Sequence, residues 1–257
     1  MQSSIEIDRT PATQYLLRVA DTCLILAQRL GEWCGHAPVL EEDIAMANIA
    51  LDLVGQARAL LTRAGQIEGR LHDEDQLAFL RSERDYFNLT LVELPRGDFA
   101  FSVLRNAMVA TWMKLLWERL SDSSDAELAA IAGKALKEAR YHQQHSADWV
   151  VRLGDGTAES RLRIEAALSE LWRYVPEMFD CDEIDEEASA MKLGPLWSDL
   201  KPDWQSEMGQ ILSEARLSAP KESAFQSDGK RGRHSEHMGY ILADMQYLQR
   251  AYPGGVW

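Results

Sequence analysis

The longest helical pattern in the chain runs from residue 126 to residue 153. Apolar and small side chains recur there at steps of three and four residues: Leu128, Ile131, Ala135, Ala139, His142, Ser146, Trp149 and Leu153. This spacing places them along one stripe of an α-helix. Glu138 lies one turn before His142, on or beside the same stripe. Because a carboxylate and an imidazole are costly to bury, the pair requires a metal ion, a counter-charge or a shared proton.

Helical periodicity extends over most of the chain, and no segment alternates with period two for long enough to predict a strand. Helices are predicted at residues 14–33, 41–64, 73–94, 98–120, 126–153, 157–179, 202–217 and 235–252, with short turns across 180–200. The helices between residues 41 and 153 predict an all-α fold, a ferritin-like four-helix bundle with flanking helices. We expect a single ferritin-like domain over residues 1–257, with a core bundle at about 41–153 and the helices of about 157–252 packed on it.

Composition limits the partners and the compartment of the protein. With 41 acidic against 27 basic residues the net charge is −14, which argues against nucleic acid or an anionic membrane surface as the main partner. No uncharged apolar run is long enough to span a bilayer, and the first ten residues lack a signal-peptide pattern. We therefore expect a cytoplasmic protein. Cys23, Cys34 and Cys181 are far apart and form no Cys-x-x-Cys motif, so buried reduced thiols are expected.

A search for metal-ligand motifs tests whether the predicted bundle can hold iron. Di-iron members of the ferritin-like class take one Glu from each of two helices and a Glu-x-x-His motif from each of the other two. This chain has six histidines, and none of them has a Glu or Asp three residues before it. A tyrosine stands in the histidine position of two such motifs, at Tyr86 after Glu83 and at Tyr141 after Glu138. Neither motif is therefore complete.

The remaining helices offer few further ligands. Residues 99–117 contain no acid, and the helix at 41–64 contributes little beyond Asp52. We interpret these positions, with Glu138 and His142, as a degenerate bundle centre that binds no metal. Arg58 and Arg140 are candidates to neutralise Glu138, and a shared proton or an adventitious metal are the alternatives.

Four segments resemble a known protein family. They are RLGEWCGHAP (29–38), EEDIAMANIALDLVGQAR (41–58), KEARYHQQHSADWVVRLGDGT (137–157) and HSEHMGYILADMQYLQR (234–250). They are similar to the C subunits of the bacterial ring-1,2-phenylacetyl-CoA epoxidases, which are multicomponent oxygenases of aerobic phenylacetate degradation. The resemblance implies a ferritin-like subunit without metal or other cofactor. It also implies a hetero-oligomer with a catalytic A subunit that carries the di-iron centre, and with a reductase that supplies electrons.

Two other functions compete with this expectation. Glu138, His142 and His145, at positions i, i+4 and i+7, are the residues that a stand-alone ferritin-like metalloenzyme would use. Three ligands on one helix rarely suffice without others that converge on them, so a buried hydrogen-bonded pair is the simpler interpretation. The other alternative is a ferritin-like scaffold for a different oxygenase. The missing motifs weigh against the first alternative, and the full-length resemblance weighs against the second.

Two surface features suggest binding sites. The basic loop from Lys230 to His234 could contact the phosphates of coenzyme A or an acidic partner, although such loops are usually solvated. His234 and His237 lack a third zinc ligand.

Helix 41–64 is apolar on more than one side. Its main stripe, which we take as the inner face, comprises Ile44, Ala47, Leu51, Val54, Arg58 and Leu61. We therefore expect the second and third helices to contact the catalytic subunit.

Overall fold

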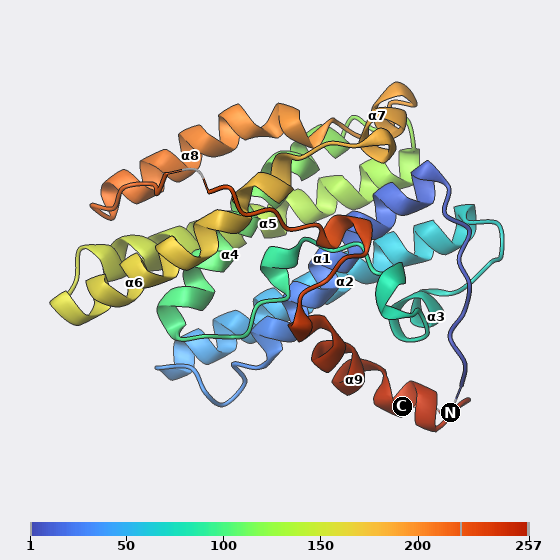
Figure 1. Cartoon of the computed structure of the whole chain (residues 1–257), viewed down its shortest axis with the longest axis horizontal. Helices are drawn as coiled ribbons and strands as arrows, with labels where there is room; N and C mark the ends of the chain where they lie inside the picture. The colour runs from blue at the N-terminus through green and yellow to red at the C-terminus, as the bar shows by residue number, and fades with distance from the viewer. Residues whose placement is uncertain (1, 222, 256–257) are drawn as a thin grey trace. The chain divides into compact units, whose positions relative to one another are not determined.

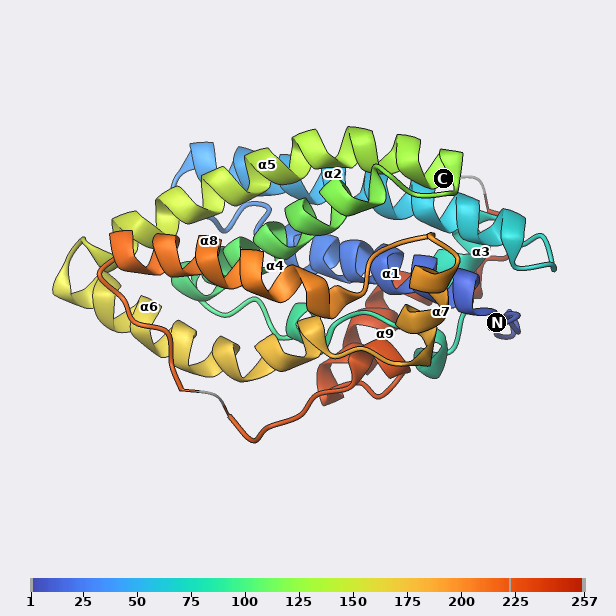
Figure 2. The same cartoon turned by 90° about the horizontal axis from the view of Figure 1, so that it is seen from above.

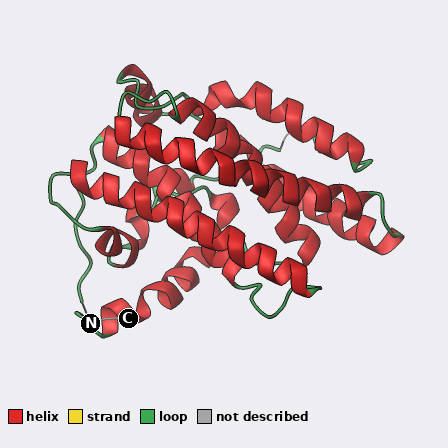
Figure 3. Cartoon of the chain, turned by 180° about the vertical axis from the view of Figure 1, so that it is seen from behind, coloured by secondary structure: helices red, strands yellow, loops and turns green. Residues whose placement is uncertain are grey.

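The structure is a computed structural model that describes residues 2–221 and 223–255. Within these ranges it has nine α-helices joined by loops and short 3-10 turns, and its only strand-like pairing is an isolated bridge between Asp228 and Arg233 (Figure 3). The predicted all-α class is confirmed. The chain forms two compact units whose sequence ranges interleave. The expected single domain over residues 1–257 stays a prediction.

The first unit comprises Met1–Cys34, Ile44–Pro95 and Ser227–Trp257. Its elements are α1 (Pro11–Gly31), most of α2 (Leu40–Ile67), α3 (Glu74–Phe79), η1 (Glu83–Asp85), η2 (Thr90–Val92), η5 (Gly229–Arg231) and α9 (Glu236–Ala251). Helix α1 begins where Thr10 caps it by accepting a hydrogen bond from the Thr13 amide at 3.2 Å. Ser235 caps α9 in the same way. Helix α9 contacts α1, α3 and η1, so the C-terminal segment completes this unit.

The second unit comprises Gly35–Asp43 and Arg96–Gln226. Its elements are α4 (Phe99–Leu120), α5 (Ala126–Gly154), α6 (Ala158–Leu171), η3 (Trp172–Phe179), α7 (Glu183–Ala190), η4 (Trp197–Leu200) and α8 (Lys201–Glu214). Helices α4, α5, α6 and α8 lie side by side (Figures 1 and 2). Buried tryptophans fill the interior: Trp112 and Trp197 meet edge to face with ring centroids 4.7 Å apart, and Trp204 donates to the Met108 carbonyl.

The helix predicted at residues 73–94 is wrong beyond residue 79. The chain there forms only α3, η1 and η2, and every residue from Tyr86 to Leu94 is buried. Burial by itself does not exclude a helix, because α4 is also buried on nearly all sides, so the backbone partners decide the course of this segment. Side chains of α1 replace the helical acceptors, because the Phe87 amide donates to Asp21 and the Leu89 amide donates to Thr22.

The buried face of α2 also differs from the prediction. Ile44, Leu51 and Val54 are 54%, 68% and 40% exposed, whereas Ile49 and Leu53 are buried. Helix α2 is apolar on two sides, and periodicity alone does not decide which side faces the core. An apolar stripe on α2 therefore faces solvent.

Helix α2 is also the one helix among the described residues that is long and apolar enough to cross a membrane. A core helix of a soluble protein passes the same test, and 44% of the apolar window in α2 is buried within the chain.

Several helix boundaries match those predicted from the sequence, and others do not. The helices predicted to start at residues 98 and 157 do start there, with Asp98 and Thr157 as the N-caps of α4 and α6, and the segment around Pro176 is a 3-10 helix in place of the end of α6. Residues 180–200 contain α7 in addition to turns. None of the three cysteines forms a disulfide within the described residues; only Cys23 is buried as expected, and Cys34 is exposed.

Candidate functional site

The predicted bundle centre on α5 is only partly buried. His142 is 3% exposed and shares the buried stripe of α5 with Ala139 and Ser146. The Glu138 side chain is 22% exposed and lies 3.7 Å from the Lys134 ammonium, and Tyr141 is 51% exposed. Glu138 and Tyr141 therefore lie at the edge and on the outside of the helix. Tyr141 does not fill an inward ligand position, which corrects the sequence interpretation.

The buried polar groups described on α4 and at its contact with α5 are neutral or cationic. Arg105 on α4 is completely buried over the Phe101 ring, with 5.8 Å between guanidinium carbon and ring centroid. The Asn106 amide donates to the Ser146 hydroxyl at 2.8 Å, and this hydroxyl donates to the His142 carbonyl at 2.7 Å. Such groups do not fit a pair of ferrous or ferric ions, which need anionic oxygen ligands.

The arginines expected to neutralise Glu138 are both at the surface. Arg58 is 73% exposed and pairs with Glu74 at 3.1 Å, and Arg140 is 59% exposed and pairs with Glu118 at 3.1 Å. Both assignments are wrong: the face of α2 that carries Arg58 points to solvent, and Arg140 lies on the exposed side of α5, where it pairs with Glu118 of α4. The buried cation of α4 is Arg105, which the sequence analysis missed. The only sequence signal for Arg105 was an arginine among apolar residues within 99–117, a range without acids.

His145 has a different partner from the one that a metal site requires. Its Nε2 lies 2.9 Å from the Glu42 carboxylate, and its buried Nδ1 has no hydrogen-bond partner within the described residues. A carboxylate only accepts, so Nε2 donates to Glu42 and is not a free metal ligand. Glu138, His142 and His145 are thus not gathered around one point. Among the described residues, no group of three or more His, Cys, Asp or Glu side chains could hold a metal ion.

Asp52 is half-buried on α2, whereas Glu83 and Tyr86 lie in the segment predicted wrongly as helix. Glu83 is exposed in η1, and Tyr86 is completely buried. The Tyr86 hydroxyl donates to the Ala78 carbonyl at 2.5 Å and accepts from Gln246 at 2.7 Å. Burial raises the pKa of Tyr86 to about 12, so the phenol stays neutral. It acts as a hydrogen-bonded core residue.

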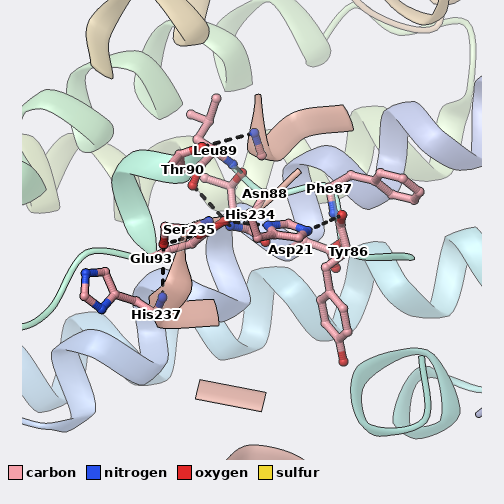
Figure 4. Close-up of polar contacts among 12 residues, drawn as sticks. Asp21, Tyr86, Phe87, Asn88, Leu89, Thr90, Glu93, His234, Ser235 and His237 are labelled. Atoms are coloured by element: carbon pink, nitrogen blue, oxygen red, sulfur yellow. Dashed lines mark hydrogen bonds and ion pairs between the residues drawn. The ribbon is translucent and has the colours of Figure 1, made fainter. Parts of the chain in front are cut away.

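A completely buried set of polar groups lies elsewhere, in the first unit around Glu93 (Figure 4). The Glu93 carboxylate accepts from the Asn88 amide at 2.9 Å, from His234 Nδ1 at 2.6 Å, and from the backbone and hydroxyl of Ser235 at 2.8 and 2.7 Å. His234 Nε2 faces the Tyr86 carbonyl at 3.0 Å. Both ring nitrogens of His234 face acceptors, so this position suits the doubly protonated imidazolium.

The electrostatics of His234 agree with this geometry. Burial disfavours the charged imidazole, but the hydrogen bond and the charge of Glu93 outweigh it, so the pKa of His234 is raised above 6.5. Neither side chain of the pair is exposed to solvent. Because no reactant can reach these groups from solvent without a rearrangement, we interpret the pair as a structural link between residues 86–93 and the C-terminal segment.

A second buried ion pair reinforces this link. The Arg81 guanidinium forms a two-pronged bond to the Asp21 carboxylate, with Nη1 2.9 Å from Oδ2, and lies 4.2 Å from the centroid of the Tyr86 ring. Gln246 and Arg250 of α9 donate to the Arg81 carbonyl at 3.0 and 2.9 Å. Helix α1, residues 81–86 and α9 are therefore held by one network.

The basic loop is not arranged to bind a phosphate. Lys230 is completely buried, and His234 is committed to Glu93. Arg231 and Arg233 both pair with Asp228, at 2.7 and 3.5 Å. The positions of these side chains thus give no support to the alternative of a phosphate contact with coenzyme A, and His234 and His237 do not form a zinc site, in line with the missing third ligand.

Together, these features define an all-α, ferritin-like protein whose described inner helix faces do not present a di-iron ligand set. The chain belongs to the family described as "Phenylacetic acid catabolic protein", which it matches over residues 1–257. It is 49% identical over 245 residues to the C subunit of the 1,2-phenylacetyl-CoA epoxidase of Escherichia coli (strain K12). The alignment covers 95% of this chain and 98% of that relative. The resemblance inferred from the four sequence segments is confirmed.

Proposed function

We propose that this chain is the non-catalytic structural subunit of a multicomponent phenylacetyl-CoA 1,2-epoxidase, a monooxygenase of aerobic phenylacetate catabolism. The observation that carries the proposal is the near full-length similarity to the C subunit of such an enzyme. The buried Arg105 and the Asn106–Ser146 bond support the non-catalytic role, since a di-iron site needs carboxylates and these groups are cationic or neutral. The complex would act in the cytoplasm as a hetero-oligomer.

The chemistry would belong to the partner. A di-iron centre in the catalytic A subunit would activate O₂ and insert one oxygen atom into the aromatic ring of the thioester. This chain would bind no cofactor, and its contribution would be to stabilise and orient that subunit. A rigid frame suits this role, because misplacement of a reacting group by even about 1 Å can cost 100-fold in rate.

The exposed apolar stripe of α2 is the surface that we assign to the catalytic subunit. Ile44, Leu51 and Val54 project from one side of a 28-residue helix and are each at least 40% exposed. Contiguous exposed apolar groups commonly mark a protein interface, and a helix of this kind packs into an apolar groove or against another helix. The contact expected through the second helix is therefore kept, and the exposed face of this helix is the proposed contact surface. The third helix, α3, is too short to share it.

The test is reconstitution of the epoxidase from purified subunits and reductase, with and without this chain. We expect epoxide formation from phenylacetyl-CoA to fall at least tenfold without the chain, and this chain alone to consume no O₂. Thioester-dependent O₂ consumption by the isolated chain would contradict the proposed function. Full activity of the other subunits in its absence would contradict the stabilising role.

A further inference from the structure

The outward face of α9 is unusually rich in exposed aromatic side chains. Tyr240, Tyr247 and Tyr252 are 74%, 57% and 57% exposed, and Leu248 is 46% exposed. Three of the seven tyrosines of the chain thus lie in solvent on or at the end of this helix. Exposed tyrosines offer large, rigid surfaces with a polar tip, which is why they are enriched among binding hot spots.

Carboxylates lie one turn to either side of Tyr240 in the sequence of α9. Glu236 precedes Tyr240 by one turn and is 82% exposed, and Asp244 follows it by one turn and is also exposed. Glu83 of η1 adds a third acid, because a Cβ placed on Gly239 would lie 3.4 Å from its Oε2. Tyr247 follows Asp244 by three residues. Carboxylates and tyrosines therefore alternate along one face of the helix.

No fixed cation of α9 lies on this face. The helix has a single basic residue besides its histidine, Arg250, and that side chain is turned inward to Gln246 and to the Arg81 carbonyl. The His237 ring lies 3.8 Å from Glu236 and is 30% exposed. The face is thus aromatic and anionic, while a glycine at position 239 leaves the helix backbone uncovered beside Glu83.

We propose that Glu236, Tyr240, Asp244 and Tyr247 form a docking face for an arginine- or lysine-bearing segment of a partner polypeptide. A guanidinium stacks on a tyrosine ring while it pairs with a carboxylate, and this face offers both kinds of group within one helical turn. The anionic groups exclude nucleic acid. The proposal rests on the proposed function, since the partner is sought among the other subunits of the epoxidase. It concerns a different surface from the apolar stripe of α2.

The experiment measures binding of this chain to each of the other purified epoxidase subunits in turn. The test variant combines Tyr240→Ser with Asp244→Lys, and the control is Leu162→Ser, a substitution at a 64% exposed leucine of α6. We expect the test variant to keep its helical circular dichroism and thermal midpoint. It should bind one subunit at least tenfold more weakly and lose part of the salt dependence of binding, whereas the control should bind as wild type does.

Three results would overturn the inference. The first is a folded test variant that binds every subunit as tightly as wild type. The second is an equal loss of binding in the Leu162→Ser control. The third is a concentration-dependent self-association that the test variant abolishes, which would make a second copy the occupant. If wild type binds none of the subunits, the proposed function itself fails. If wild type binds a subunit and the folded test variant binds it equally well, only this docking face fails, so the two failures are distinguishable.

Discussion

Glu93 shows how a charged side chain can be buried at low cost. Its carboxylate accepts four hydrogen bonds, from Asn88, His234 and twice from Ser235, and neither it nor His234 is exposed. A buried ion pair is tolerated only where its partner and hydrogen bonds replace the lost water. If one partner is removed, the other remains as a buried charge.

We expect Glu93→Gln to lower the free energy of unfolding by about 3–5 kcal/mol, because it leaves the His234 imidazolium without its counter-charge. The matched control is Asp203→Asn, which removes an exposed pair with Arg119 and should change the free energy by less than about 1 kcal/mol. Urea unfolding followed by circular dichroism measures both. Equal effects of the two variants would show that Glu93 is not an essential counter-charge.

The buried Glu93–His234 pair also predicts that the stability of the protein depends on pH. Since the pKa of His234 is raised in the folded protein, its contribution is complete below the unfolded pKa of about 6.5 and is lost as the pH rises through the higher folded value. The free energy of unfolding of wild type relative to His234→Gln should therefore decline across that window. Urea titrations at a series of pH values test this, and a difference that grows with rising pH would contradict the assignment.

At the scale of elements, α2 and the segment 81–94 show the same limit of sequence patterns. Periodicity predicted α2 correctly as a helix but favoured the wrong side as its inner face, because both sides are apolar. In the segment 81–94 the apolar residues resemble a helix stripe, yet Asp21 and Thr22 of α1 take the backbone amides and hold a non-helical course. Residues that are distant in the sequence therefore decide both the buried face of α2 and the course of residues 81–94.

Leu51 and Leu53 of α2 provide a matched test of the exposed face. Leu51 is 68% exposed and Leu53 is 3% exposed, although they are two residues apart. We expect Leu53→Ala to lower the free energy of unfolding by about 2–5 kcal/mol and Leu51→Ala to change it by less than about 0.5 kcal/mol. Chemical unfolding of the isolated subunit measures the pair. Reversed effects would show that the predicted inner face was the correct one.

Binding to the catalytic subunit should also depend on Leu51. We expect Leu51→Asp to weaken association with the catalytic subunit at least tenfold while the isolated chain keeps its fold, because a carboxylate would be desolvated in an apolar contact. Leu162→Asp on α6 is the control for an exposed leucine outside this stripe. Surface plasmon resonance with the purified catalytic subunit gives both affinities. Undiminished binding of Leu51→Asp would move the interface away from α2.

At the scale of the whole molecule, the stability of the chain should not depend on a metal. The inner faces of α4 and α5 hold Arg105, Asn106 and Ser146, and the described residues offer no group of three metal-binding side chains. We therefore expect protein purified without chelator to contain far less than one iron or manganese per chain, and EDTA to leave its thermal midpoint unchanged. Near-stoichiometric metal that stabilises the fold would favour the metalloenzyme alternative.

The sequence by itself determined the helical class, the caps at Asp98 and Thr157, the incomplete ligand motifs and the family, because each depends on local spacing or on residue identity. Tertiary structure alone decided which face of α2 is buried and that residues 81–94 leave the helical course. It also decided that Arg58 lies in solvent while Arg105 does not. The physical reason is that burial and charge neutralisation depend on groups brought together from distant parts of the chain, which periodicity does not record.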